Sequence, residues 1–303
     1  MLRLASRFSY SILASLPLLL NAQAHESGPL LLLLPAGPRA AAFGNAWVVG
    51  RDENVVFSNP SLINATTGFG ISYSRYDNEG QVGTFAYGTT VGRFTFGVGA
   101  RTAVYSPSVG AGLPFEPAEL LESSDRQAMS VLTAVGMNMT YAGNRVGITA
   151  KYAEDRVTYS GSPATLPRQS VFYADFGLSR PFLNGTFGFA IQNIGSGRGG
   201  ERPAQTSLGW TRARILGEFD LVVAGAVTIR DYWVSPGGGV ELGYGWIEGW
   251  STAFRLGARK TETDVQKPIS AGWTLNADRL GLDYAVELFE GDRLAHHLSL
   301  RWR

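Results

Sequence analysis

Two short runs of this chain contain residue types that could carry chemistry. Residues 195–200, Gly-Ser-Gly-Arg-Gly-Gly, fit the G-x-G-x-x-G pattern with which a strand–loop–helix unit holds a dinucleotide. His296 and His297, followed by Ser299, offer a base and a hydroxyl nucleophile of the kind that a hydrolase needs. The glycine-rich run separates two strand-like stretches and no helix follows it, so we interpret it as a loop and expect no dinucleotide cofactor.

The histidine and serine residues do not by themselves predict catalysis. A serine nucleophile also needs a positioned base and an oxyanion hole, and the chain lacks G-x-S-x-G or another acyl-transfer signature. His297 and Ser299 would share one face of a strand, where ordinary packing explains them. With three histidines and no cysteine, a metal site is not expected. We therefore predict a protein that is not an enzyme, and we keep an outer-membrane hydrolase as the third alternative.

The composition is unusual for a water-soluble domain. The 303 residues include 38 glycines, 12% aromatic residues and 17% charged residues, where a soluble domain carries about 25% charged residues. The mean hydropathy is close to zero, which excludes a bundle of apolar helices. The net charge of +1 provides no attractive field for nucleic acid, so no nucleic-acid partner is expected.

From Phe69 onward, apolar and polar residues alternate with a period of two, as on strands that have one apolar and one polar face. Such stretches run for about 10–13 residues, which is longer than ordinary strands and long enough to cross a membrane at a tilt. We count about fourteen of them, and the connections between them alternate between tight and long. The long ones are 106–125, 160–167, 195–202 and 261–266. This arrangement predicts a closed transmembrane antiparallel β-barrel, because hydrocarbon cannot satisfy the backbone groups of an open sheet edge.

Several charged residues lie in the middle of these predicted strands, on the face opposite the apolar one. On a barrel they would line the lumen, where they could contact a solute or, as we favour, pair with one another and hold a plug. These predicted lumen-lining residues are Arg101, Lys151, Arg255, Arg259, Asp283 and Glu287.

The first 24 residues have the features of a secretory signal peptide. Arg3 and Arg7 precede the apolar stretch 12–20, and Ala22-Gln23-Ala24 places small residues before a predicted cleavage at His25. The apolar stretch is too short for a membrane-spanning helix, which needs about 20 residues. We divide the chain into a signal peptide (1–24), an N-terminal plug (25–66) and the barrel (67–303), and expect location in the outer membrane, in contact with its lipids.

The N-terminal region resembles a known family. Residues 35–46, Pro-Ala-Gly-Pro-Arg-Ala-Ala-Ala-Phe-Gly-Asn-Ala, are similar to the start of PorV-type outer-membrane proteins, relatives of the FadL-type transporters. Asp52-Glu53 with residues 57–62, Phe-Ser-Asn-Pro-Ser-Leu, is similar to the Asn-Pro-Ala element of that group, and 191–195, 282–285 and 297–300 resemble its later motifs. The resemblance implies a hatch inside the barrel, for which the candidate residues are Phe43, Gly44, Asp52, Asn59 and Pro60.

The resemblance implies two functions that the sequence does not separate. The first is FadL-like binding or uptake of a hydrophobic or amphipathic small molecule, with displacement of the plug and lateral exit through a break in the wall, for which residues 237–239, Gly-Gly-Gly, are one candidate. The alternative is a docking role in protein secretion and surface attachment. In that role the connections, above all 106–125, would bind a protein of the secretion system.

Overall fold

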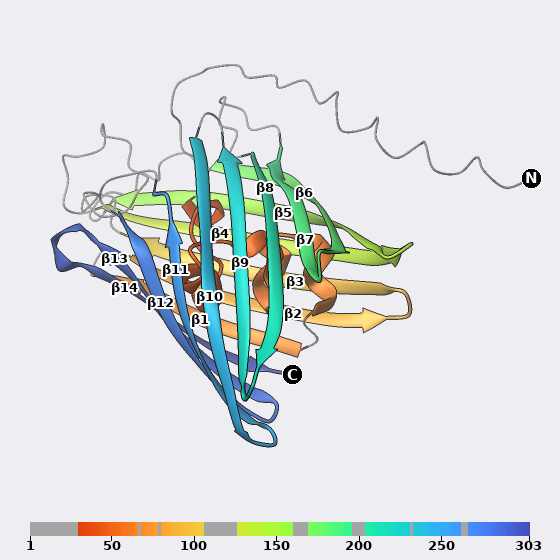
Figure 1. Cartoon of the computed structure of the whole chain (residues 1–303). Coiled ribbons are helices and arrows are strands. Elements are labelled where there is room, and N and C mark those ends of the chain that lie inside the picture. Colours follow the sequence, from red (N-terminus) through yellow and green to blue (C-terminus); the bar gives the residue numbers. More distant parts are fainter. Residues whose placement is uncertain are drawn as a thin grey trace, which may run out of the picture.

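A computed structural model describes residues 30–65, 68–77, 80–105, 126–159, 169–195, 204–230, 233–261 and 266–303. Within these residues the chain forms fourteen antiparallel strands in a closed barrel, in which each strand pairs with its sequence neighbours and the first pairs with the last (Figure 1). The predicted all-β barrel is therefore confirmed. The strands are β1 (Gly68–Tyr76), β2 (Gly80–Val91), β3 (Phe94–Tyr105), β4 (Arg126–Tyr141), β5 (Asn144–Tyr159), β6 (Gln169–Phe182), β7 (Gly185–Ile194), β8 (Gln205–Leu216), β9 (Phe219–Arg230), β10 (Trp233–Ile247), β11 (Trp250–Arg259), β12 (Gln266–Ala277), β13 (Leu280–Phe289) and β14 (Leu294–Trp302).

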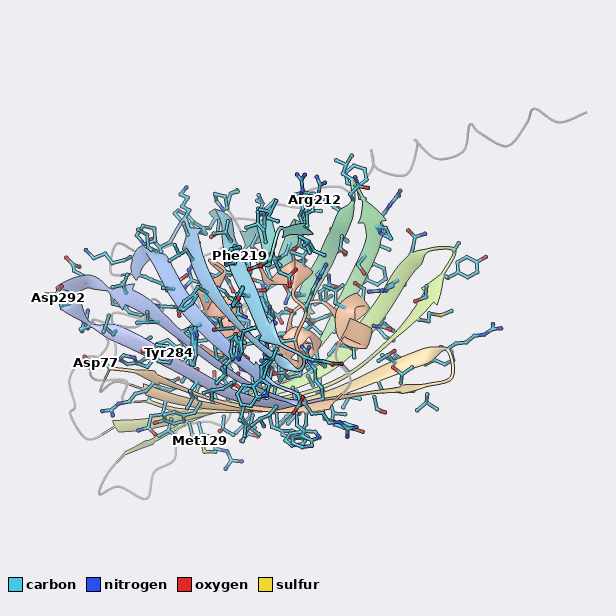
Figure 2. The ribbon with its side chains drawn as sticks, turned by 60° about the horizontal axis from the view of Figure 1, so that its bottom comes forward. Asp77, Met129, Arg212, Phe219, Tyr284 and Asp292 are labelled. Carbon is cyan, nitrogen blue, oxygen red and sulfur yellow. The ribbon has the colours of Figure 1, made fainter. Side chains whose placement is uncertain are left out.

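The two faces of the wall differ in the way the alternation predicted. On β3, Phe94, Phe96 and Val98 point outward and are 38–39% exposed, whereas Arg101 points inward and is 2% exposed. Figure 2 shows side chains on both faces of the barrel wall. An outer surface of large apolar side chains suits contact with lipid, while the polar side chains are kept inside.

The two ends of the barrel also differ. At one end, six turns of two residues join the strands: 92–93, 142–143, 183–184, 217–218, 248–249 and 278–279. This end, which we call the short-turn end, also holds the start of β1 and the end of β14. The opposite, long-connection end includes Asp77 and Asp292 (Figure 2). Before the turn 183–184, β6 continues through Pro181 and Phe182.

A segment of the chain lies inside the barrel (Figure 1). This inner segment, residues 30–65, consists of η1 (Leu30–Leu32), α1 (Pro38–Ala42), η2 (Trp47–Val49), η3 (Glu53–Phe57) and η4 (Pro60–Ala65). It contacts the wall nearly all round: α1 touches β11–β14, η2 touches β7–β9, and η3 and η4 touch β1–β6. None of the helices among the described residues is long and apolar enough to cross a membrane. The predicted signal peptide lies outside the described residues.

The predicted break in the wall at 237–239 is wrong. Gly237, Gly238 and Gly239 belong to β10 and are paired with β9 on one side and β11 on the other, so the ladder is continuous there. The glycines have a steric role instead. A Cβ on Gly237 or Gly239 would lie less than 3.0 Å from atoms of the inner segment or the wall, so the missing side chains make room for the inner segment.

Candidate functional site

The inner segment is held together by one buried amide. Asn59, which is completely buried, donates from Nδ2 to the carbonyl oxygen of Val48 at 2.7 Å, and its Oδ1 accepts from the backbone N–H of Ser61 at 3.1 Å and from the Ser61 hydroxyl at 2.7 Å. Asn59 thus ties η2 to the start of η4. An amide with these bonds satisfies polar backbone groups in a place that water does not reach.

Pro60 connects the inner segment to the barrel wall. It begins η4, and its carbonyl oxygen accepts from Nδ2 of Asn138 on β4 at 3.0 Å. Gly147 and Gly177 face this point, and a Cβ on either would lie less than 3.0 Å from Asn59, Pro60 or Ser61. The wall therefore approaches the Asn59–Pro60 backbone more closely than a side chain would permit.

Phe43 and Gly44 end α1 against β10 and β11. Gly44 has a φ of +58°, and a Cβ there would lie less than 3.0 Å from the backbone of Ala258. Gly257 on β11 and Gly239 on β10 leave the space that Gly44 and Phe43 occupy. This contact requires glycine on both sides, because the chain enters the left-handed region and two backbones meet closely.

Two cations of the wall bind the inner segment through its backbone. Arg101, on β3, donates from Nη1 to the carbonyl oxygens of Leu31 at 2.6 Å and Leu34 at 3.2 Å, and from Nη2 to that of Pro35 at 2.7 Å. Lys151, on β5, donates from Nζ to the Phe57 carbonyl oxygen at 2.9 Å. Lys151 also pairs with Asp175 of β6 at 2.6 Å. Charged donors make strong bonds to carbonyl oxygens in a buried place.

A second group of charges lies on β10–β14 near the short-turn end. Asp283, which is fully buried, pairs with Nη1 of Arg255 at 3.3 Å and with Nε of Arg301 at 2.5 Å, and Arg255 also contacts Glu241. Arg39, from α1, reaches the same Glu241 at 2.9 Å. Here the wall charges mostly neutralise one another, and only Arg39 comes from the inner segment.

A third group lies nearer the long-connection end. Glu287 accepts from Nη2 of Arg259 at 2.6 Å and lies 3.1 Å from Nε2 of His297, whose Nδ1 is 2.8 Å from the Ser74 hydroxyl. Ser299 instead contacts Asp283 at 3.3 Å, so His297 and Ser299 do not form the hydrolase-like pair that was considered from the sequence. The six predicted lumen residues thus face inward in three separate places and form no single site.

Asp52 and Glu53 form a pair of buried carboxyl groups inside the segment. Asp52 caps η3, since its carboxyl oxygen Oδ1 accepts from the backbone N–H of Asn54 at 3.0 Å. Burial and the neighbouring Glu53 raise the pKa of Asp52 to about 8, and burial also raises the pKa of Glu53. Asp52 therefore holds its proton at neutral pH.

Two small cavities lie next to each other toward the long-connection end, with volumes of about 60 and 80 Å³. They share lining residues, among which Leu33, Leu34 and Pro35 of the inner segment are the largest apolar group. Arg101 and Lys151 line one cavity, and Arg259 and Glu287 line the other. Each cavity therefore combines apolar side chains with a few charged groups, which is the lining of a small-molecule site, in a volume smaller than the roughly 300–1,000 Å³ of such sites.

Sequence reasoning missed the partners of the predicted residues. Arg39, Glu241 and Arg301 complete the group around Asp283, and Asp175 pairs with Lys151. The alternation of the strands could have placed Glu241, Asp175 and Arg301 on the inner face. Only the strand register, however, places Glu241 directly opposite Arg255, and Asp175 and Arg301 diagonally across from Lys151 and Asp283.

Among the described residues, no group of three or more histidine, aspartate or glutamate side chains is arranged to hold a metal ion. No protein-family model matches the chain. No curated protein matches it either.

Solved structures share the fold. The Ralstonia pickettii toluene transporter TbuX is 11% identical, with 88% of this chain and 98% of that chain covered and a TM-score of 0.58. The Pseudomonas putida toluene transporter TodX is 8% identical, with 82% and 91% covered and a TM-score of 0.51. A TodX deltaS2S3 mutant, described as a monoaromatic hydrocarbon channel, is 8% identical, with 88% and 98% covered and a TM-score of 0.57. At these identities the likeness shows a common barrel architecture.

Proposed function

We propose that this protein is an outer-membrane channel that binds hydrophobic or amphipathic small molecules and lets them pass. The observation that carries the proposal is a closed barrel whose lumen is occupied by a separately folded segment, with two partly apolar cavities beside it. The barrel architecture shared with toluene transporters supports the same function. We further propose that residues 1–24 direct export and are removed, so that the barrel inserts into the outer membrane.

In this mechanism a solute enters from the long-connection end, which faces outward when the short turns face the periplasm. It enters beside Leu33 and Leu34, where the two cavities of about 60 and 80 Å³ widen to hold it and apolar surface leaves water. Further passage requires the inner segment to move, and the bonds of Arg101 to the carbonyl oxygens of Leu31, Leu34 and Pro35 are the ones nearest the solute. No covalent bond of the solute is made or broken.

A reversible cross-link tests whether the inner segment must move. The chain has no cysteine, so an added pair cannot form a wrong disulfide. A Cβ on Gly209 of β8 would lie less than 3.0 Å from Cγ1 of Val48, which brings the two Cβ atoms within reach of a disulfide after the double substitution V48C/G209C. Neither position contributes a charged group or a side-chain hydrogen bond.

Uptake of radiolabelled toluene would be measured in cells that produce the double variant, in oxidising and then in reducing medium. We expect uptake to fall to the background level when the disulfide is closed and to return on reduction, while V48C and G209C alone behave alike in both media. Unchanged uptake by fully cross-linked protein would contradict the proposed movement. Absence of uptake by the native protein would contradict the channel itself.

The docking alternative suggested by the PorV-type resemblance makes a different prediction. A docking protein would co-purify with a stoichiometric protein partner, and closing the V48C/G209C disulfide would leave that association intact. The connection 106–125, to which this alternative assigned the binding, lies outside the described residues. The cavities beside the inner segment favour the channel, because a docking role does not need them.

A further inference from the structure

A third and larger cavity, of about 440 Å³, lies at the short-turn end of the lumen. We call it the vestibule. It opens between α1 and the ends of β10–β14, and the turns 248–249 and 278–279 form part of its rim. The charged residues that line it are Arg39, Glu241, Arg255, Asp278, Arg279, Arg301 and Arg303.

The vestibule contains more cations than its carboxylates can neutralise. Arg39 and Arg255 share Glu241, and Arg255 and Arg301 share Asp283, so three guanidinium groups depend on two carboxylates. Arg279 and Arg303 add two more guanidinium groups at the mouth, where both residues are exposed, and Asp278 adds one carboxylate, so that five guanidinium groups face three carboxylates. The backbone N–H of Arg303 donates to the carbonyl oxygen of Arg279 at 2.9 Å, which holds these two residues together.

Two further observations indicate that this positive charge is not fully neutralised. Nε of Arg39 is buried and finds no hydrogen-bond partner among the residues that the structure describes. Partial burial and the positive charges of Arg301 and Arg39 lower the pKa of Arg303 from its usual value, and the opposite effect of Glu53 and Asp52 is smaller. A buried donor and a set of repelling cations are both stabilised by an anion placed between them.

We propose that the vestibule binds an oxyanion, a carboxylate or a phosphate, carried either by a free small anion or by the headgroup of a small amphiphile. Guanidinium groups bind both kinds of oxyanion through paired N–H donors, and a cavity that narrows among arginines strengthens that attraction. The site goes beyond the proposed function, because it lies at the opposite end of the lumen from the two small cavities and selects for charge rather than for apolar surface.

Binding can be measured by calorimetric titration of the purified barrel in a non-ionic detergent. The probes are inorganic phosphate and benzoate as free anions, octyl phosphate as an amphiphile, and benzyl alcohol as an uncharged comparison. The variant R279Q/R303Q removes the two cations at the mouth without touching an ion pair of the wall. The control R93Q/R214Q removes two exposed arginines near other turns of the same end, with the same change in net charge.

We expect saturable binding of an oxyanion that weakens about fivefold or more in R279Q/R303Q, is unchanged in R93Q/R214Q and falls as salt is added. Binding of phosphate or benzoate assigns the site to free anions, whereas binding of octyl phosphate alone assigns it to a headgroup. The proposal is overturned if the native protein binds none of the three anions. It is equally overturned if R279Q/R303Q binds them as tightly as the control does. Because none of these outcomes depends on toluene uptake, the channel can fail or hold independently.

Discussion

The two sides of the barrel use buried charge in different ways. On the β3–β6 side, Arg101 and Lys151 direct their charges at carbonyl oxygens of the inner segment. On the β10–β14 side, Arg255, Asp283 and Arg301 pair with one another, and the wall holds itself together. A cation on the first side therefore fixes the segment, whereas a charge on the second side stabilises the barrel. This difference predicts that substitutions on the two sides will separate segment docking from barrel stability.

The largest effect is expected on the β10–β14 side, from Asp283→Asn. This change leaves the buried guanidinium groups of Arg255 and Arg301 without the carboxylate that they share. Breaking a buried ion pair on one side costs roughly 3–5 kcal/mol. The measurement is the denaturant midpoint at which the unboiled protein loses its fast migration on a gel. Asp220→Asn, at an exposed position, is the control, and equal midpoints for the two variants would refute the role given to Asp283.

A smaller effect is expected where the segment meets β10 and β11, from Gly44→Ala. The left-handed backbone costs an alanine about 1–2 kcal/mol, and the close backbone of Ala258 adds a steric penalty. The control is Gly217→Ala, because Gly217 has a φ of +64° but nothing within 4 Å of an added Cβ. We expect Gly44→Ala to lower the denaturant midpoint more than Gly217→Ala. Equal losses would show that only the backbone conformation matters at Gly44.

The same comparison shows what the sequence could predict. The alternation of Phe94, Phe96 and Val98 with Arg101 was sufficient to place Arg101 on the inner face, and the alternating turn lengths were sufficient to predict a closed barrel. Neither pattern could reveal that Arg101 binds carbonyl oxygens, because backbone partners leave no mark in the sequence. Residues 237–239 were misread for a related reason: a glycine run indicates a loop or a close approach equally well, and only the packed inner segment decides.

An effect that is confined to the inner segment is expected from Arg101→Met on the β3 side. Methionine fills a similar volume but loses three bonds to the carbonyl oxygens of Leu31, Leu34 and Pro35. We expect segment docking to weaken by about 2 kcal/mol, which is roughly thirtyfold faster hydrogen exchange, with little change in the barrel midpoint. Peptides covering 31–43 would be compared with peptides from β12 and β13. A loss in the barrel midpoint as large as that of Asp283→Asn would contradict the distinction between the two sides.

The smallest effect is expected from pH, and it also concerns the segment. Asp52 faces Glu53 within the segment, Arg39 on α1, and Arg301 and Asp283 on the wall, and its pKa is raised to about 8 by burial and by Glu53. Since the folded pKa exceeds the unfolded value of 3.8, docking takes up a proton. The stabilisation is complete below the unfolded pKa and is lost as pH rises through about 8.

Within that window, one pH unit changes the docking free energy by at most about 1.4 kcal/mol, or tenfold. We therefore expect protection factors of amides 52–57, corrected for the intrinsic exchange rate, to fall by up to this factor between pH 6 and pH 7. Asp52→Asn keeps an oxygen that can accept the bond from Asn54 but cannot titrate. Its protection should therefore fall less with pH than that of the native protein, and the remaining fall comes from Glu53, whose pKa burial also raises. If the protection of the native protein falls no more than that of Asp52→Asn, Asp52 is ionised when docked, and Arg39 and Arg301 outweigh its burial.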